Sequence, residues 1–257
     1  MTKNSLYPST LFHFTKKDGF LNILKETFKI SYAREAIKSP KNERKYAVPM
    51  VSFCDIKLSE IKYFIEKGYG NYGIGLTKEW ANKNGLTPVM YINRHSDIAD
   101  NLIEGLNSMY AHISKLSNKS ELNRMAKSYH NILNLYRYVK NYEGELIRDE
   151  LLVDSNYRFA DEREWRYVPS LEIPYIEPFV AISNIKTKSQ KELYNQKVSH
   201  LKLSFEPEDI KYLFVENEDD IIELINHLDY AKSRYDSVTR KRLVSRILTV
   251  EQIKNDF

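Results

Sequence analysis

One short segment concentrates the side chains best suited to chemistry. Residues 161–169, DEREWRYVP, place three acids, two arginines and an indole within six positions and then continue into β-prone residues. If this segment is a strand, Glu162, Glu164 and Arg166 share one face, because successive side chains alternate. Two carboxylates beside a guanidinium can be held ionised and oriented, which suits stabilising a developing cation or accepting a proton. The same pattern is typical of a charged edge strand whose acids and arginines pair with neighbours, and residue chemistry alone favours that alternative.

A second set of polar candidates lies on or beside three strands that are predicted near the N-terminus. These strands are expected over residues 11–15, 28–32 and 47–55, and the candidates are His13, Thr15, Tyr32, Arg34 and Ser52. His13 lies between two phenylalanines, so its ring needs a polar partner. A ribose hydroxyl and a neighbouring backbone carbonyl are both open to it, and the residue pattern by itself favours the carbonyl.

The sequence lacks the motifs of several other common chemistries. It contains no zinc-ligand spacing, Walker loop, dinucleotide-binding glycine fingerprint or nucleophile elbow. His112 and His130 have no partner ligand four residues further on, so we expect no metal site. The glycine-rich run 68–75 follows a predicted helix and lacks a Lys-Ser/Thr ending, so we expect it to serve tight backbone packing.

The elements that must position these side chains predict an α+β fold with a mixed or antiparallel β core. Residues 96–142 carry apolar side chains at helical spacing on both sides of a polar break at 117–120, which predicts a helical hairpin inserted between strands. We expect one α+β domain over residues 1–257. Other strands are predicted over 69–76, 88–92, 146–153, 157–168, 200–205, 212–216 and 243–248, and other helices over 18–27, from 59, over 219–228 and after 249.

Composition indicates where in the cell the protein is located and which classes of partner it could bind. The chain has one cysteine, Cys54, which fits a reducing cytoplasm. No apolar run approaches the roughly 20 residues of a membrane span, and no signal-type stretch follows Met1, so we expect a cytoplasmic protein without membrane contact. Net charge is only +4, but basic residues cluster in loops near 38–45, 186–202 and 234–246. Solvated loops explain most such clusters, and a surface for nucleic acid or a nucleotide is the alternative.

Five segments, taken together and in order, resemble one known family. They are LFHFT at 11–15, PMVSFCDI at 49–56, YGIGLTKEW at 72–80, PVMYI at 88–92 and YRFADEREWRYVP at 157–169. The resemblance is to the AbiGi family of abortive phage-resistance proteins and covers nearly the whole chain. It implies a role in phage defence as the antitoxin-like member of a two-gene pair, whose partner resembles a nucleotidyltransferase toxin.

A second resemblance is to ADP-ribosyltransferases of the DarT and PARP-like kind, which open with a strand carrying a His-x-Thr element and carry a glutamate on a late strand. It implies NAD as the ligand. Glu164 would then be the catalytic carboxylate, Glu162 the auxiliary acid of a Glu-x-Glu pair and Arg166 the orienting partner of Glu164. His13 and Thr15 would hold the nicotinamide ribose, Tyr32 or Ser52 would line the nicotinamide pocket, and Arg34 is a further candidate for NAD contact. The middle strand departs from the pattern, because it has no clear Ser-Thr-Ser signature.

Three hypotheses about function follow. The first is an anti-phage defence protein with an NAD-dependent ADP-ribosyltransferase-like site. The second is a non-catalytic antitoxin or regulator that binds a toxin, or another defence protein encoded nearby, through the 96–142 hairpin. The hairpin has a simpler explanation as a cover for one face of the sheet. The third is a nucleic-acid-binding repressor that uses the basic loops.

Overall fold

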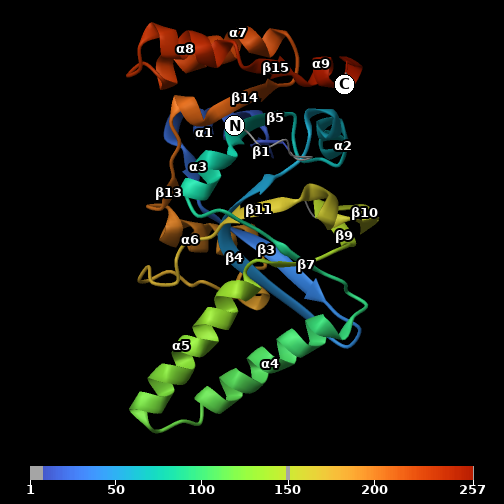
Figure 1. Cartoon of the computed structure of the whole chain (residues 1–257), viewed down its shortest axis with the longest axis vertical. Coiled ribbons are helices and arrows are strands. Elements are labelled where there is room, and N and C mark those ends of the chain that lie inside the picture. Colours follow the sequence, from blue (N-terminus) through green and yellow to red (C-terminus); the bar gives the residue numbers. More distant parts are fainter. Residues whose placement is uncertain (1–7, 149–150, 257) are drawn as a thin grey trace, which may run out of the picture.

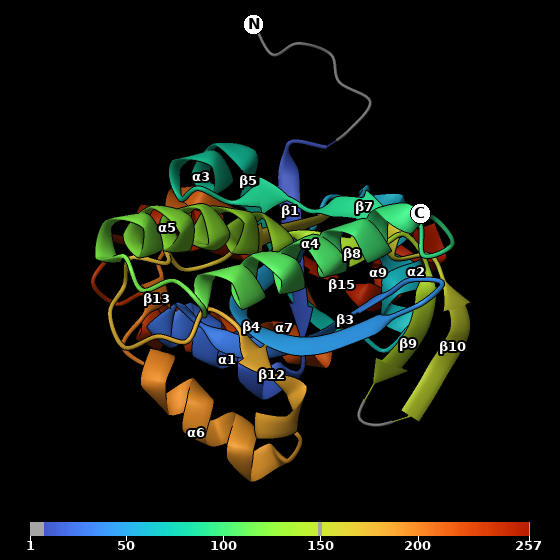
Figure 2. The same ribbon diagram turned by 90° about the horizontal axis from the view of Figure 1, so that it is seen from below.

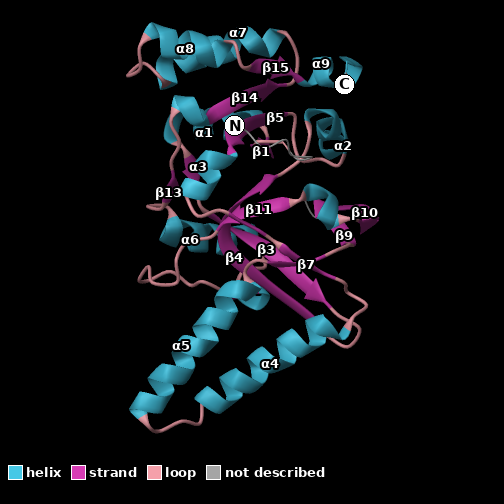
Figure 3. Ribbon diagram, viewed as in Figure 1, coloured by secondary structure: helices cyan, strands magenta, loops and turns pink. Residues whose placement is uncertain are grey.

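The protein is built around a mixed sheet, seen here in a computed structural model that describes residues 8–148 and 151–256 (Figures 1 and 3). Along the sheet the strands follow the order β15 (Ile247–Thr249), β14 (Ile210–Val215), β5 (Tyr72–Thr77), β1 (Thr10–Thr15), β4 (Glu43–Cys54), β11 (Glu164–Tyr167) and β6 (Thr87–Pro88). Two more strands, β3 (Ser31–Lys38) and β12 (Val180–Ala181), also pair with β4. β14 and β15 run parallel, whereas the other described pairs of this sheet are antiparallel. The expected α+β class is therefore confirmed.

The sheet is joined only loosely at its centre. β1 pairs with β5 over six positions, from Thr10 opposite Thr77 to Thr15 opposite Tyr72. On its other side, β1 pairs with β4 at a single described position, Phe12 opposite Cys54. The two strands therefore diverge, and the sheet separates into a half that contains β1, β5, β14 and β15 and a half that contains β3, β4 and β11. Figure 1 shows these halves as the upper and lower parts of the molecule.

The first half of the sheet is covered by helices on both faces. Alternation along β1 divides its side chains, since Leu11 belongs to one core cluster and Phe12 to another. The Leu11 face packs against α1 (Lys17–Glu26), α3 (Lys78–Lys83), α7 (Asp219–Ala231) and α8 (Ser237–Val244). The Phe12 face packs against α2 (Ile61–Glu66) and α9 (Val250–Asp256).

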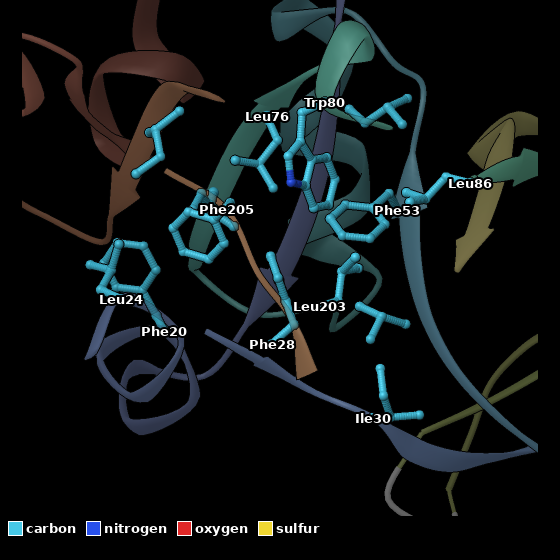
Figure 4. Close-up of a cluster of buried hydrophobic side chains, with 14 of the residues drawn as sticks. Phe20, Leu24, Phe28, Ile30, Phe53, Leu76, Trp80, Leu86, Leu203 and Phe205 are labelled. Atoms are coloured by element: carbon cyan, nitrogen blue, oxygen red, sulfur yellow. The ribbon is translucent and has the colours of Figure 1, made fainter. Parts of the chain in front are cut away.

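On the Leu11 face, aromatic rings fill the core between the half of the sheet that contains β1 and the half that contains β4 (Figure 4). The ring of Phe28 in β2 (Phe28–Lys29) lies 5.2 Å from that of Phe53 and 5.4 Å from that of Phe205, measured between centroids. Trp80 lies 5.4 Å from Phe53, and its indole N–H donates to the Ser204 carbonyl. Edge-on arrangements of this kind contribute beyond simple burial, so the cluster fixes β2 and its partner β13 (Lys202–Leu203) against β4.

The hairpin consists of α4 (Asp97–Ile113) and α5 (Lys119–Tyr136), and its two halves differ in environment. The buried residues of the hairpin lie near the ends that join the body, and they are Ala99, Asp100, Ile103, Leu106, Leu133 and Tyr136. Four of them, Ala99, Ile103, Leu106 and Tyr136, belong to a third core cluster with residues of β3 and β4. No residue from 107 to 132 is buried. Figure 1 shows this outer hairpin, residues 107–132, extending away from the sheet, and Figure 2 shows α4 and α5 side by side from below. Part of the hairpin therefore covers the sheet, and part does not.

One helix and two pairs of strands complete the second half. The helix α6 (Lys188–Val198) packs on β3, where Asn195 Oδ1 accepts from the Tyr32 backbone N–H. The parallel pair β7 (Met90–Ile92) and β8 (Val139–Asn141) brings the end of the hairpin back beside β11. The ribbon of β9 (Gly144–Arg148) and β10 (Leu151–Tyr157) then leads to a 3₁₀ turn at Phe159–Glu162.

The glycine-rich run serves close packing. Gly70 has φ +111°, and a Cβ built there would come within 2.3 Å of the Thr15 carbonyl oxygen. Neither the backbone conformation nor the space suits a side chain. Gly73 and Gly75 lie against the rings of Phe14 and Phe12. The sequence interpretation of this run is confirmed.

Several predicted elements were wrong in detail. The strand expected over 243–248 begins only at Ile247, because residues 243–244 end helix α8 and residues 245–246 form a turn. Asp236 caps that helix by accepting from the Thr239 N–H at 2.7 Å. The second helix of the hairpin ends at Tyr136 rather than near 142, and the strand β8 follows it. Residues 200–205 contribute only the two-residue strand β13. The strand expected over 157–168 is interrupted by the turn that precedes Glu164.

Candidate active site in the groove of the divided sheet

A groove of about 1450 Å³ runs along the line where β1 and β4 diverge. His13, Ser52, Glu162 and Glu164 line it together. They come from β1, β4 and the two sides of the turn into β11, so the fold brings together residues that lie up to 151 positions apart. A smaller pocket of about 400 Å³ also has His13 and Ser52 in its wall. These two residues therefore stand between both cavities.

His13 bridges the two halves of the sheet. Its ring Nδ1 lies 2.8 Å from the carbonyl oxygen of Ser52, and because a carbonyl can only accept, Nδ1 carries the proton. Burial lowers the pKa of His13 below its ordinary value, and the bond to Ser52 opposes that shift only in part. The ring is thus neutral near pH 7, with Nε2 as an acceptor. The residue pattern favoured a backbone carbonyl over a ribose hydroxyl as the partner of the His13 ring, and that prediction is confirmed.

Glu164 begins β11 directly opposite Cys54 and is almost fully buried. One carboxylate oxygen, Oε1, accepts from Ser52 Oγ at 2.6 Å and from Arg166 Nε at 2.7 Å. The other, Oε2, accepts from Lys140 Nζ at 2.8 Å and from Arg166 Nη2 at 3.2 Å. Its backbone N–H donates to the hydroxyl of Tyr91. Four donors hold this carboxylate in one orientation.

Glu162 joins the same cluster from the turn. Its Oε2 accepts from Lys140 Nζ at 2.9 Å, so one ammonium bridges both glutamates. Its Oε1 accepts from the hydroxyl of Tyr69. The prediction that Glu162 lies on the strand was wrong, since the 3₁₀ turn ends at Glu162 and Arg163 adopts a left-handed conformation with φ +44°. The turn nevertheless directs Glu162 toward the ammonium that binds Glu164.

Arg166 lies behind Glu164, outside the lining of the groove. It is fully buried, and its guanidinium contacts Glu164, the carbonyl of Arg137 at 2.9 Å and Glu35 Oε2 at 3.1 Å. A buried guanidinium needs such partners because its charge is costly to remove from water. Arg166 therefore lies behind Glu164, to which it donates two hydrogen bonds, and does not itself line the groove.

The charges in this cluster keep Glu164 ionised. Burial alone would raise the pKa of Glu164, but Arg166 and Lys140 outweigh it and hold that pKa well below its usual range. Burial would lower the pKa of Lys140, but Glu162 and Glu164 outweigh burial and raise that pKa. Burial, assisted by Glu162 and Glu164, raises the pKa of Cys54 well above its ordinary value. The thiol is thus protonated and unsuited to act as a nucleophile.

Three other predicted residues have different surroundings. Thr15 ends β1 with its hydroxyl against Gly19 of α1. Tyr32 is fully buried, and its hydroxyl donates to the Glu177 carbonyl at 2.7 Å. Arg34 does line the groove, and its guanidinium donates to the carbonyls of the loop before α6. The structure therefore gathers His13, Ser52, Arg34 and the two glutamates at the groove, and places Thr15 and Tyr32 elsewhere.

Lys140, Tyr69 and Tyr91 complete the cluster, and the sequence did not single them out. Lys140 was assigned to the end of a helix, although Val139, Lys140 and Asn141 alternate buried and half-exposed positions as a strand does. Its Nζ also lies 4.7 Å from the ring centroid of Phe159. The available signal was a lysine that follows Val139 in a short run bounded by Tyr138 and Tyr142.

Two negative findings bear on the expectations for ligands and membranes. Within residues 8–148 and 151–256, no group of three or more His, Cys, Asp and Glu residues could hold a metal ion. Over the same described part of the chain, no helix has the length and apolar character needed to cross a membrane.

Comparison with known proteins identifies the family. The family model described as "Putative abortive phage resistance protein AbiGi, antitoxin" matches residues 22–216, which include the strand of Ser52 and the whole Glu162–Arg166 cluster. A protein named abortive phage resistance protein AbiGi, from Lactococcus lactis subsp. cremoris, is 26% identical over 230 residues, which cover 83% of this chain and 90% of that protein. No solved structure matches the chain. Because the family model spans well over half of the sequence, this chain belongs to the AbiGi family.

Proposed function

We propose that this protein acts in abortive phage defence and that its groove is an NAD-dependent ADP-ribosyltransferase-like site. The family membership supports the first part. The second part depends on one observation: His13, Ser52 and Glu164 meet at the line where the sheet divides. The groove exceeds the roughly 300–1,000 Å³ of ordinary small-molecule pockets, so a dinucleotide fits its size.

In the proposed reaction the bond between nicotinamide and C1′ of the ribose breaks, and the bonding electrons leave with nicotinamide. Positive charge then develops at C1′ and the ring oxygen. A fixed, ionised carboxylate close to the ribose stabilises that charge, and Glu164 is such a group. The acceptor's lone pair forms the new bond to C1′, and the acceptor releases its proton to solvent. The smaller pocket beside His13 and Ser52 would take the nicotinamide ring.

Ser52 gives the ribose a way to reach Glu164. The carboxylate already accepts four bonds, and three of them come from charged partners that are costly to displace. The Ser52 hydroxyl is the neutral donor in this set, and it has an alternative acceptor in Met50 Sδ at 3.4 Å. A ribose hydroxyl can thus replace Ser52 at Glu164 without breaking an ion pair.

The test is transfer of label from radioactive NAD to cell extract by the purified protein. Glu164→Gln should abolish transfer, and Glu164→Asp, which keeps the charge but withdraws the carboxylate, should lower it by about 10²-fold or more. Glu145→Gln is the matched control, because Glu145 is an exposed residue that lines the same groove. Circular dichroism and thermal unfolding establish that each variant is folded. Undiminished transfer by folded Glu164→Gln, or no NAD binding by the wild type, would overturn the proposal.

A second candidate function is that of a non-catalytic antitoxin that binds a toxin protein. The family description includes the word antitoxin, and the outer hairpin carries apolar side chains that neither helix buries fully. Four of them, Ile113, Leu116, Leu122 and Met125, are half-exposed. Four basic residues, Lys115, Lys119, Arg124 and Lys127, stand among them with one acid, Glu121. An acidic amphipathic helix of the toxin would complement this surface.

Co-purification with the product of the neighbouring gene tests the antitoxin function. Ile113→Lys with Met125→Lys should release the partner, whereas Asn107→Lys, an exposed position on the same hairpin, should not. If the double variant retains the complex at wild-type levels, the outer hairpin is not the docking element. A wild-type chain that purifies alone would remove this function.

A further inference from the structure

A group of basic side chains at the groove has no role in the cluster around Glu164. Arg34 on β3 and Lys188 and Lys191 on α6 all line the groove. Lys188 and Lys191 are three residues apart on the helix, so they lie on the same face. Arg34 and the two lysines are about 150 positions apart in the sequence, and the packing of α6 on β3 brings them together.

The support beneath these residues is rigid. A capping box at Thr187 begins α6, with the Thr187 hydroxyl accepting from the Gln190 N–H at 3.1 Å and Gln190 Oε1 accepting from the Thr187 N–H at 3.0 Å. Two contacts fix the helix to Tyr32. Asn195 Oδ1 accepts from the Tyr32 backbone N–H at 2.9 Å, and the rings of Tyr194 and Tyr32 lie 5.5 Å apart, measured between centroids. The lysines therefore extend from a fixed helix rather than from a mobile loop.

Arg34 is held in place by two of its nitrogens, Nε and Nη2. Its Nε donates to the Ile185 carbonyl at 3.0 Å and its Nη2 to the Lys186 carbonyl at 2.5 Å. Its Nη1 donates to no group among the described residues, so the two hydrogens on that nitrogen are open to a ligand. Bonds to neutral carbonyls leave the positive charge of Arg34 without a compensating anion.

The lysines likewise form no ion pair within residues 8–148 and 151–256. Burial lowers the pKa of Lys191, and the nearby charge of Arg34 lowers it further. Two of the acids that line the groove, Glu35 and Glu192, are the sequence neighbours of Arg34 and Lys191. Glu35 is engaged by Arg166 at 3.1 Å, and Glu192 forms no ion pair with the described cations. Like charges placed together without an anion indicate a site that an anionic ligand completes.

We propose that Arg34, Lys188 and Lys191 form a diphosphate-binding site in the groove. The Nη1 hydrogens of Arg34 and the two ammonium groups would donate to phosphate oxygens, and the ligand class is a nucleoside diphosphate or a dinucleotide joined through a diphosphate. This inference deepens the proposed function, because the diphosphate of NAD would be held here while Glu164 faces its nicotinamide ribose. Assigning the three cations to the ligand also gives α6 a role in binding.

Calorimetric titration with ADP, inorganic pyrophosphate and adenosine tests the site without requiring any chemistry. ADP and pyrophosphate should bind and adenosine should not, and the affinity should fall as salt rises. Lys188→Gln and Lys191→Gln should each weaken ADP binding by about tenfold, the effect of losing one charge-assisted bond. Lys186→Gln removes the same charge from an exposed position beside the site whose side chain does not line the groove, and should leave the affinity unchanged.

The outcomes separate this inference from the proposed function. ADP binding that depends on Lys188 and Lys191 supports the site, even if the protein never cleaves NAD. NAD cleavage whose KM is unaffected by the lysine substitutions overturns the site and leaves the proposed function intact. Equal weakening by Lys186→Gln, or adenosine binding as tight as ADP binding, also overturns it. So does an oligonucleotide that binds more tightly than ADP through the same lysines, since the ligand would then be a nucleic acid.

Discussion

Two networks of opposite charges tie distant parts of this chain together, and they differ in how deeply they are buried. Between α1 and α7, Lys17 contacts Asp220 at 2.7 Å and Glu223 at 2.6 Å, and the side chains of Lys17, Glu223 and Asp220 are 37%, 52% and 10% exposed. At the groove, Lys140, Glu162, Glu164 and Arg166 are 15%, 5%, 4% and 0% exposed. Two of the three side chains in the first network remain open to solvent, whereas the second network is buried along the wall of a cavity.

The difference in burial indicates that the two networks have different roles. An exposed pair can hold two helices together while water continues to solvate its charges. Burying four charged side chains has a large desolvation cost, which well-packed apolar residues would avoid. The groove network therefore has a larger desolvation cost than an ion pair needs merely to hold two elements together. Its position beside His13 and Ser52 gives a reason for that cost, since an ionised and fixed carboxylate is what the proposed chemistry needs.

Arg166→Met should have the largest effect on stability. It removes the charge behind Glu164 and leaves that carboxylate buried with one cation, Lys140. Breaking a buried ion pair typically costs about 3–5 kcal/mol in the free energy of unfolding. Urea unfolding of the wild type and the variant measures the loss. A loss no larger than that of a surface substitution would show that Arg166 does not support Glu164.

Lys140→Met should have a smaller effect, about 2–3 kcal/mol, because charge-assisted bonds are lost at both glutamates but Arg166 remains at Glu164. It should also raise the pKa of Glu164, since a nearby positive charge is removed. The same unfolding measurement applies, with Lys67→Met as the control for an outer ion pair, in which Lys67 lies 2.7 Å from Asp154. Equal losses in the two variants would contradict the distinction drawn here.

The stability that Glu164 contributes should depend on pH in a defined direction. Its pKa in the folded protein lies below the ordinary value of 4.5, so its contribution is fully present above that value and is lost as pH falls toward the folded pKa. The difference in unfolding free energy between the wild type and Glu164→Gln should be constant near pH 7 and shrink as pH falls below 4.5. A difference that grows on acidification would have the wrong sign.

Asp220→Asn should have the smallest effect. The asparagine can still accept from the Tyr72 hydroxyl, and Lys17 keeps Glu223 as a partner. We expect a small shift in thermal unfolding, reduced further at high salt because Lys17 and Glu223 are partly exposed to solvent. A loss as large as that of Arg166→Met would mean that surface and groove networks are equivalent.

The sequence predicted the groove residues better than the geometry that joins them. Glu164, His13 and Ser52, which line the groove, and Arg166, which lies behind Glu164, were recognisable because polar side chains stand on predicted strands. The position of Glu162 was missed, because Arg163 turns left-handed and alternation ends there. Lys140 was missed because its strand is three residues long and follows a helix directly. The division of the sheet between β1 and β4 depends on a single paired position, which no periodicity records.

The most direct test of the central claim is phage plating on cells that express the protein from its native locus. Cells with wild-type protein should give few plaques, and cells with Glu164→Gln should give as many plaques as cells that lack the gene. Glu145→Gln should protect as the wild type does, and immunoblotting should show equal amounts of all three proteins. Full protection by Glu164→Gln at wild-type abundance would contradict the account and leave the groove cluster as a structural ion-pair network.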